Sequence, residues 1–161
     1  PGACLFLCGE IAMDPSKLVC SALIEELEQL RDDVRQTAES LSEKQLWAKP
    51  VEPGNSVGHL ILHLTGNLNF FVGAQLGGTG YVRDREREFT ETQPIPKAAL
   101  LANLDTAVAM FRRVVGGLNA EQLAAPHPTA KFGSVLKALL HFVAHFAVHR
   151  GQISYIVRML K

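Results

Sequence analysis

Four long segments in which apolar residues recur at three- and four-residue steps constrain the fold more than any other feature of this sequence. The first begins at Asp14 and Pro15, where an acidic cap precedes a proline whose missing N–H costs little at the first helical position. The others begin near Ser56, after Pro96 and near Gly133. The sequence shows no convincing strand-like alternation bounded by turn residues, so these helices must bury their apolar faces against one another. The sequence therefore predicts an all-α four-helix bundle.

The expected core consists of the apolar stripe on each helix. Its members are Leu23, Leu27, Leu30 and Val34 in the first helix, Leu60, Leu64, Leu68 and Phe71 in the second, Leu101, Leu104, Val108, Phe111, Val115 and Leu118 in the third, and Val135, Leu139, Phe142, Phe146, Ile153, Ile156 and Leu160 in the fourth. The first two connections are longer than the roughly two to eight residues that usually join helices in bundles. Three arrangements fit such long connections: they carry short helices, such as one in SEKQLW, they cross the end of the bundle, or they border a pocket.

The composition indicates a globular domain with neither nucleic acid nor membrane as a partner. Of the 161 residues, 47% are hydrophobic, which suffices for one domain with a sizeable core, expected to span residues 14–161. The 16 basic and 16 acidic residues balance, and the mixed run RDREREF at residues 83–89 is interpreted as a solvated loop. No apolar stretch approaches the roughly 20 residues that span a bilayer.

Residues 1–13 are interpreted as an N-terminal extension. Met13 is a candidate native start, and the residues before it are expected to be a cloning remnant or an upstream extension. Cys4, Cys8 and Cys20 make an odd count near this end, which argues against a disulfide framework. We therefore expect free thiols and a cytoplasmic protein.

The stretch HFVAHFAVHRGQ places His141, His145 and His149 four residues apart in the last helix. His149 occupies the position between Phe146 and Ile153 where packing would favour Leu or Ile, and a buried imidazole without a partner is costly. His145 lies one turn earlier and about 40° round the helix. Histidines at positions i and i+4 can converge on one ion, so this pair is a candidate metal half-site.

A third ligand would have to come from another helix, and SVGHLILHLTGN in the second helix offers His59 and His63. His63 flanks the apolar stripe and His59 is rotated about 40° further from it, so we expect His63 to be the inward one. His127, in the loop PHPT, is expected to be exposed. The residues alone leave open whether the helical histidines bind a metal or are hydrogen-bonded core residues.

NSVGHLILHLTGN together with the C-terminal HFAVHRGQI resembles the DinB/YfiT-like family of helical-bundle metalloenzymes, over most of the chain. The resemblance implies a divalent metal held by His63, His145 and His149. It implies a four-helix bundle with long crossing connections that forms a homodimer. It also implies a low-molecular-weight thiol as a partner in transfer or isomerisation reactions. Zinc and nickel both suit imidazole ligands.

Other polar residues near these histidines are candidates for contact with the ligand imidazoles or with a small-molecule substrate. They are Asn67, His141, Arg150 and Gln152. Gln152 is placed to hydrogen-bond an imidazole, while Arg150 is expected first of all to pair with a carboxylate on a neighbouring helix. Gly151 is expected to permit close helix packing. No catalytic residue is assigned, because no carboxylate stands beside the histidines as in H-E-x-x-H enzymes.

Three neutral imidazoles leave an open coordination position, as in catalytic zinc sites. We therefore expect a divalent-metal-dependent enzyme, either a thiol-dependent S-transferase or a related small-molecule hydrolase. The alternative is a non-catalytic dimeric helical bundle whose metal is structural or absent. The two interpretations differ in whether an accessible cavity lies beside the histidines.

Overall fold

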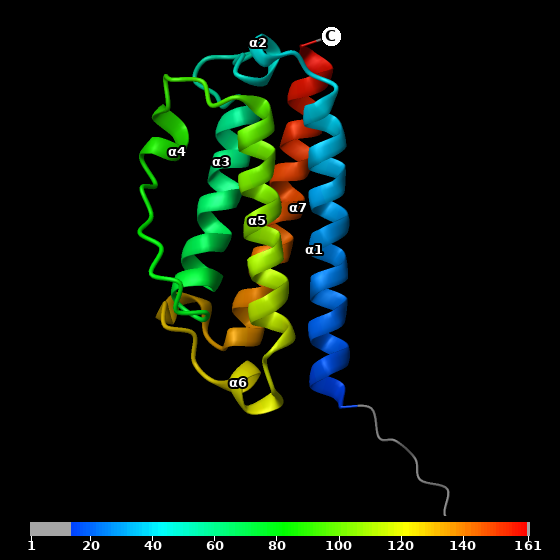
Figure 1. Ribbon diagram of the computed structural model, residues 1–161, viewed down its shortest axis with the longest axis vertical. Coiled ribbons are helices and arrows are strands. Elements are labelled where there is room, and N and C mark those ends of the chain that lie inside the picture. The colour runs from blue at the N-terminus through cyan, green and yellow to red at the C-terminus, as the bar shows by residue number, and fades with distance from the viewer. Residues whose placement is uncertain (1–13, 161) are drawn as a thin grey trace, which may run out of the picture.

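Four long helices run side by side in the computed structural model, which describes residues 14–160 (Figure 1). They are α1 (Pro15–Glu39), α3 (Val57–Leu68), α5 (Lys97–Gly116) and α7 (Val135–Met159). The shorter elements are α2 (Glu43–Leu46), the π-helical turn η1 (Asn69–Ala74), α4 (Arg87–Thr90), α6 (Ala120–Ala124) and the 3₁₀ turn η2 (Ala130–Phe132). The predicted all-α four-helix bundle is confirmed. The extension at residues 1–13, with Cys4 and Cys8, lies outside the described residues.

Each long helix begins where the sequence supplies a cap or a proline. The Asp14 side chain accepts a hydrogen bond from a backbone N–H in the first turn of α1. Ser56 caps α3 and Ser134 caps α7 in the same way, whereas α5 starts directly after Pro96. These starts agree with the predicted boundaries, and SEKQLW forms α2 as expected.

The order of the helices around the bundle differs from their order in the sequence. α1 packs against α5 and α7, and α3 packs against the same two helices, so α1 and α3 face each other diagonally. The connection through α2 therefore crosses one end of the bundle, and the connection through α6 crosses the other (Figure 1). α3 and α5 run in the same direction, because residues 75–96 return along the outside of the bundle. This return segment packs α4 against α3.

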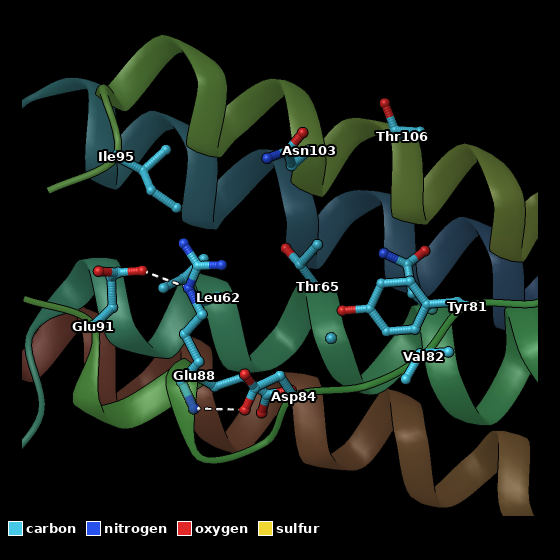
Figure 2. Close-up of a pocket in the computed structure, with 13 residues that line it drawn as sticks. Leu62, Thr65, Tyr81, Val82, Asp84, Glu88, Glu91, Ile95, Asn103 and Thr106 are labelled. Atoms are coloured by element: carbon cyan, nitrogen blue, oxygen red, sulfur yellow. Dashed lines mark hydrogen bonds and ion pairs between the residues drawn. The ribbon is translucent and has the colours of Figure 1, made fainter. Parts of the chain in front are cut away.

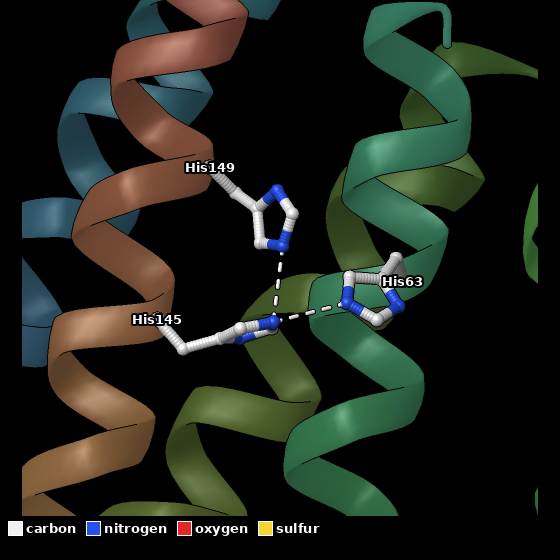
Figure 3. Close-up of side chains that lie close together, drawn as sticks. All are labelled: His63, His145 and His149. Carbon is white, nitrogen blue, oxygen red and sulfur yellow. Dashed lines mark hydrogen bonds between the residues drawn. The ribbon is translucent and has the colours of Figure 1, made fainter. Parts of the chain in front are cut away.

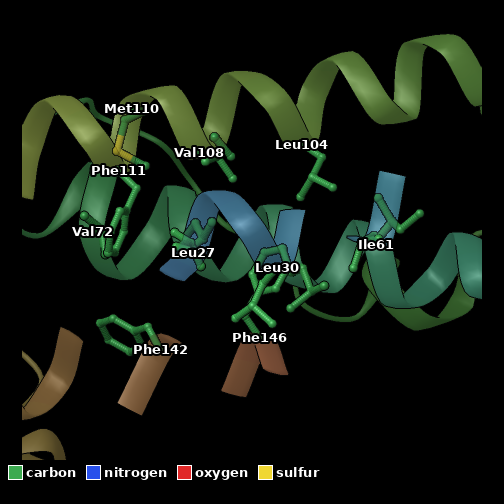
Figure 4. Close-up of a cluster of buried hydrophobic side chains, with 14 of the residues drawn as sticks. Leu27, Leu30, Ile61, Val72, Leu104, Val108, Met110, Phe111, Phe142 and Phe146 are labelled. Carbon is green, nitrogen blue, oxygen red and sulfur yellow. The ribbon is translucent and has the colours of Figure 1, made fainter. Parts of the chain in front are cut away.

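The predicted apolar stripes form a single core between the four helices (Figure 4). Phe142 and Phe146 of α7 are almost fully buried, and Phe142 stacks on Phe71 of η1 with ring centroids 5.4 Å apart. Cys20 of α1 is a free thiol inside this core. Within residues 14–160, none of the helices combines the length and the apolar character that crossing a membrane requires.

Candidate metal centre

Three histidines from two helices converge where α3 meets α7 (Figure 3). His63 comes from the middle of α3, while His145 and His149 come from adjacent turns of α7. The Nε2 atom of His145 lies 3.1 Å from Nε2 of His63 and 3.0 Å from Nε2 of His149. One ligand atom from each histidine lies within 4.8 Å of the other two, close enough to hold one metal ion. We call this group the histidine trio.

Hydrogen bonds at the other ring nitrogen determine which atom of each imidazole faces the centre. His63 Nδ1 lies 2.8 Å from Glu88 Oε2, and His149 Nδ1 lies 2.7 Å from Gln152 Oε1. An ionised carboxylate or an amide oxygen can only accept. The Glu88 contact is shorter than the 3.3 Å between His63 Nδ1 and Arg83 Nη2, so it decides the tautomer: both Nδ1 atoms carry the hydrogen and both Nε2 atoms present a lone pair. The Nε2 atom of His145 carries at most one hydrogen, so it can donate to only one of these two Nε2 atoms. The trio is therefore a cluster of acceptors, which a cation would satisfy.

The geometry of the trio fits a divalent ion that prefers nitrogen ligands. Zinc binds imidazole nitrogen at about 2.0–2.1 Å, so the edges of a tetrahedral site are about 3.3–3.4 Å long. The Nε2–Nε2 distances of 3.1 and 3.0 Å lie close to that value. Three ligands would leave a fourth position open, as in catalytic zinc sites. His63 is buried whereas His145 and His149 are partly exposed, so a ligand reaches the centre from the α7 side.

A buried ion pair holds His63 in place. Glu88 of α4 is 6% exposed, and Arg83 Nε donates to its Oε1 at 2.6 Å while His63 bonds its Oε2. Burial alone would raise the pKa of the Glu88 carboxyl, but hydrogen bonds from Arg83 and His63 outweigh burial and lower the pKa. Glu88 is therefore ionised. Gly66 leaves room for it, because a Cβ atom at Gly66 would overlap Glu88 Oε1.

The two histidines of α7 are neutral at ordinary pH. Burial lowers the pKa of His145 to about 3, and repulsion from the protonated forms of His149 and His63 adds to the effect. Burial also lowers the pKa of His149, although its hydrogen bond to Gln152 opposes the shift. Neutral imidazole is the form that binds metal, so protons compete weakly with a metal ion here.

Two further candidates, His141 and Asn67, lie near the trio without joining it. His141 is exposed, and its ring centroid lies 6.2 Å from that of His145. Asn67 is buried on α3, one turn beyond His63. Within residues 14–160, no hydrogen bond joins the Asn67 side chain to the trio. Neither residue positions an imidazole as Gln152 and Glu88 do.

The residues that follow His149 point in different directions. Arg150 donates to Asp33 of α1 at 2.8 Å, the helix-to-helix ion pair that the sequence favoured, and so faces away from the trio. Gly151 is exposed, and a Cβ atom added there would meet no atom within 4 Å. The expectation that Gly151 permits close helix packing is therefore wrong.

Two other histidines tie backbone segments together. His59, expected to lie further outward than His63, is only 4% exposed; its Nδ1 bonds the cap residue of α3, and its Nε2 lies 3.1 Å from the Glu91 carbonyl. His127, expected to be exposed, is only 2% exposed and donates from Nε2 to the Phe71 carbonyl at 3.2 Å. The expectation of an exposed His127 is wrong, because this imidazole finds partners that satisfy it when buried. His59 does turn away from the trio, as expected, but the return segment covers it.

The sequence did not reveal Glu88 as a site residue, and it offered Arg83 only as part of a pocket rim with Asp84 and Arg85, an interpretation ranked below a solvated loop. Glu88 and Arg83 both belong to RDREREF, which the sequence suggested to be solvated, yet their side chains are 6% and 9% exposed. A run of mixed charges does not indicate which carboxylate will be buried. One signal was present in Gly66, a glycine inside an apolar helix three residues after His63, because such a glycine often marks a close approach.

Glu88 also borders a cavity on the other side of α3. This cavity has a volume of about 460 Å³ and lies between α3, α5 and the return segment (Figure 2). Its wall includes the polar side chains of Tyr81, Asn103 and Thr106 and none of the trio. Thr65 lines it as well, with a buried hydroxyl that has no hydrogen-bond partner among residues 14–160. Glu88 therefore lies between this cavity and His63 of the candidate metal centre.

The fold and the trio together define a class of protein: a helical bundle with crossing connections and three imidazoles between two helices. Residues 22–160 match the family model of mycothiol-S-transferase. The chain therefore belongs to the mycothiol-S-transferase family. No curated protein gives a significant match to the sequence.

Two solved structures with the same fold are from Bacillus subtilis and Enterococcus faecalis. YfiT from Bacillus subtilis, described as a probable metal-dependent hydrolase with an unusual four-helix bundle topology, has a TM-score of 0.71 and 20% identity, covering 88% of this chain and 87% of that one. A conserved protein from Enterococcus faecalis has a TM-score of 0.71 and 17% identity, covering 92% of this chain and 98% of that one. At these identities the likeness establishes the fold, and the resemblance to DinB/YfiT-like bundles is confirmed.

Proposed function

We propose that this protein is a divalent-metal-dependent thiol S-transferase, with His63, His145 and His149 as the metal ligands. The observation that carries the proposal is the convergence of three Nε2 atoms, two of them held as acceptors by Glu88 and Gln152. Family membership supports a low-molecular-weight thiol as substrate, and mycothiol is the thiol in the family's name. Zinc and nickel both suit three imidazole ligands.

A bound ion would supply Lewis acidity at the trio, lowering the pKa of a thiol so that the sulfur is a thiolate near neutral pH. Glu88 and Gln152 keep His63 and His149 in the tautomer that points Nε2 at the centre. Arg83 keeps Glu88 ionised, so this acceptor is not lost to protonation. The partly exposed α7 side of the trio admits the thiol from solvent.

The transfer reaction joins the thiol sulfur to an electrophilic carbon of an acceptor molecule. The thiol gives up its proton to solvent, the sulfur electron pair forms the new carbon–sulfur bond, and the leaving group departs with the electron pair of the bond that breaks. Only the thiolate is an effective nucleophile, which is why a site that favours the thiolate accelerates the reaction.

The first test is metal content, measured by elemental mass spectrometry on the wild type and on His63→Ala, His145→Ala and His149→Ala. We expect about one ion per chain in the wild type, and loss of the ion in each variant that circular dichroism shows to be folded. His141→Ala is the matched control, because His141 lies on α7 one turn before His145 and outside the trio; it should keep the ion. Wild-type protein that takes up no zinc, nickel or manganese would contradict the proposal.

The second test separates transfer from hydrolysis, which a three-histidine site also supports through an activated water. Metal-loaded protein is incubated with a chlorinated fluorogenic acceptor, with and without mycothiol. We expect a product that contains the thiol sulfur and that forms faster with metal-loaded protein than with metal-free protein. Metal-dependent turnover without thiol would identify a hydrolase, and metal binding without any turnover would favour the non-catalytic bundle.

A further inference from the structure

An apolar groove runs along the junction of α3 and α7, one turn of α7 beyond His149. Its volume is about 540 Å³, within the range of about 300–1,000 Å³ that small-molecule sites occupy. One wall is the C-terminal half of α7, including Val148, Tyr155 and Met159, and the other includes Val51 and Leu60. The groove is therefore large enough for a small molecule.

Gln152 connects the groove to the candidate metal centre. Gln152 lines the groove, and the same side chain accepts the hydrogen bond from His149 Nδ1 at 2.7 Å. Leu60 lies three residues before His63 on α3, and Val148 directly precedes His149 on α7. A molecule in the groove would have one end close to the trio.

The chemistry of the walls favours an uncharged, apolar ligand. Within residues 14–160, none of the side chains that line the groove carries a charge, whereas the cavity behind Glu88 is bordered by Asp84 and Arg87. Val51, Val148 and Tyr155 line the groove, and 55%, 61% and 64% of their respective surfaces are exposed to solvent. Four exposed apolar side chains, those of Val51, Val148, Tyr155 and Met159, thus gather at this one groove.

Gly151 is a second and independent sign that the groove receives a ligand. It stands in the interior of α7, where glycine lowers helix stability relative to alanine. No close packing requires it, because an added Cβ atom would meet nothing within 4 Å. Gly151 lines the groove, so the missing side chain leaves the space beside Gln152 open.

We infer that the groove binds the apolar, uncharged part of the acceptor molecule, so that the preferred acceptors are hydrophobic electrophiles. This inference rests on the proposed transferase function. We assign the groove to the acceptor rather than to the thiol. Mycothiol is a polar thiol, and among the residues that line the groove Asn55 and Gln152 are the main hydrogen-bonding partners it would find. The electrophilic carbon then lies at the end nearest His149.

The test fills the groove with Gly151→Phe and compares it with Leu140→Phe. Leu140 is an exposed apolar residue of the same helix outside the groove, so its variant adds a similar ring elsewhere. The probe is the neutral apolar dye N-phenyl-1-naphthylamine, whose fluorescence reports binding without any catalysis. We expect saturable binding to wild type and Leu140→Phe, weakened about tenfold in Gly151→Phe, as expected when contact equal to about two methylenes is lost.

A second readout uses primary haloalkane acceptors of increasing chain length with the metal-loaded protein and mycothiol. In the wild type kcat/KM should rise by up to about fourfold for each added methylene, and this rise should flatten in Gly151→Phe. Equal dye binding in all three proteins would overturn the inference. So would transfer to the shortest acceptor without any dependence on chain length, a result that leaves the transferase proposal standing. If Gly151→Phe instead converts a dimer to a monomer in light scattering, with dye binding unchanged, the groove seats a second copy and the inference fails.

Discussion

At the residue scale, hydrogen-bond acceptors orient two of the three imidazoles that we propose as metal ligands. Glu88 and Gln152 decide that His63 and His149 present Nε2 to the centre. Such partners fix the ring orientation and raise the basicity of the ligand nitrogen, so losing one weakens metal binding even when all the ligands remain.

Replacing Glu88 by glutamine tests this role. Glu88→Gln keeps the shape but removes the charge that Arg83 and His63 share, so we expect metal affinity to fall about 10- to 100-fold. Zinc affinity is measured by competition with a chromogenic chelator. Glu86→Gln is the matched control, since Glu86 is an exposed carboxylate of the same run and should bind zinc as the wild type does. Equal affinities in both variants would show that Glu88 only fills space.

The pKa of His145 predicts how the metal-free protein responds to acid. The unfolded chain takes up a proton near pH 6.5, whereas burial delays protonation of His145 in the folded state to about pH 3. Between these values the unfolded state binds more protons, so the free energy of unfolding decreases as the pH falls. Urea midpoints at pH 7, 6, 5 and 4 should therefore decline, and less steeply in His145→Gln. An unchanged slope in that variant would contradict the assignment.

At the scale of elements, the site depends on how closely α4 approaches α3. α4 has only one turn and contributes one buried residue, Glu88, which reaches His63 across a gap that Gly66 leaves open. The position of the short helix α4 at the surface of the bundle thereby sets the orientation of the His63 imidazole, which we propose as a metal ligand.

Gly66→Ala tests this close approach. Alanine favours the helical conformation more than glycine, yet its methyl group would overlap the Glu88 carboxylate and push α4 outward. We expect a folded protein with metal affinity lowered about tenfold or more, in line with the loss of an acceptor behind a ligand histidine. Gly116→Ala, whose Cβ would make only an ordinary contact with Ile24, is the control. Isothermal titration with zinc measures both, and wild-type affinity in Gly66→Ala would refute the prediction.

At the scale of the whole molecule, the trio links helices that are distant in sequence. His63 and His145 are 82 residues apart, and they meet because α3 and α7 are neighbours in the bundle. An ion bound to both helices binds the folded state and not the separated segments of the unfolded chain.

Metal should therefore stabilise the fold by mass action. Free zinc at about 100 times its dissociation constant is expected to add about 2.7 kcal/mol to the free energy of unfolding. Thermal denaturation should show a higher Tm with zinc for the wild type and no change for His63→Ala. Magnesium, which prefers oxygen ligands, is the control ion and should leave the Tm unaltered. A zinc-induced rise in His63→Ala would mean that the ion binds elsewhere.

Most of the fold could be read from the sequence, because its signals are local. Asp14, Ser56 and Ser134 cap helices wherever the surrounding chain lies, and apolar residues at helical spacing predict a buried face without any knowledge of its partner. The three-dimensional order of the helices was less accessible. That α1 and α3 lie diagonally depends on how all four stripes pack at once.

The sequence by itself determined the helices and, through spacing and family resemblance, which three histidines to consider as ligands; that they bind metal is still a prediction. Only the tertiary structure decided that Glu88 is the buried carboxylate of residues 83–89 and that the imidazole of His127 is buried rather than solvated. Glu88 lies 25 residues from His63, and His127 lies 56 residues from Phe71. The physical reason is that a polar group is buried only where a partner is present, and that partner comes from wherever the folded chain brings it.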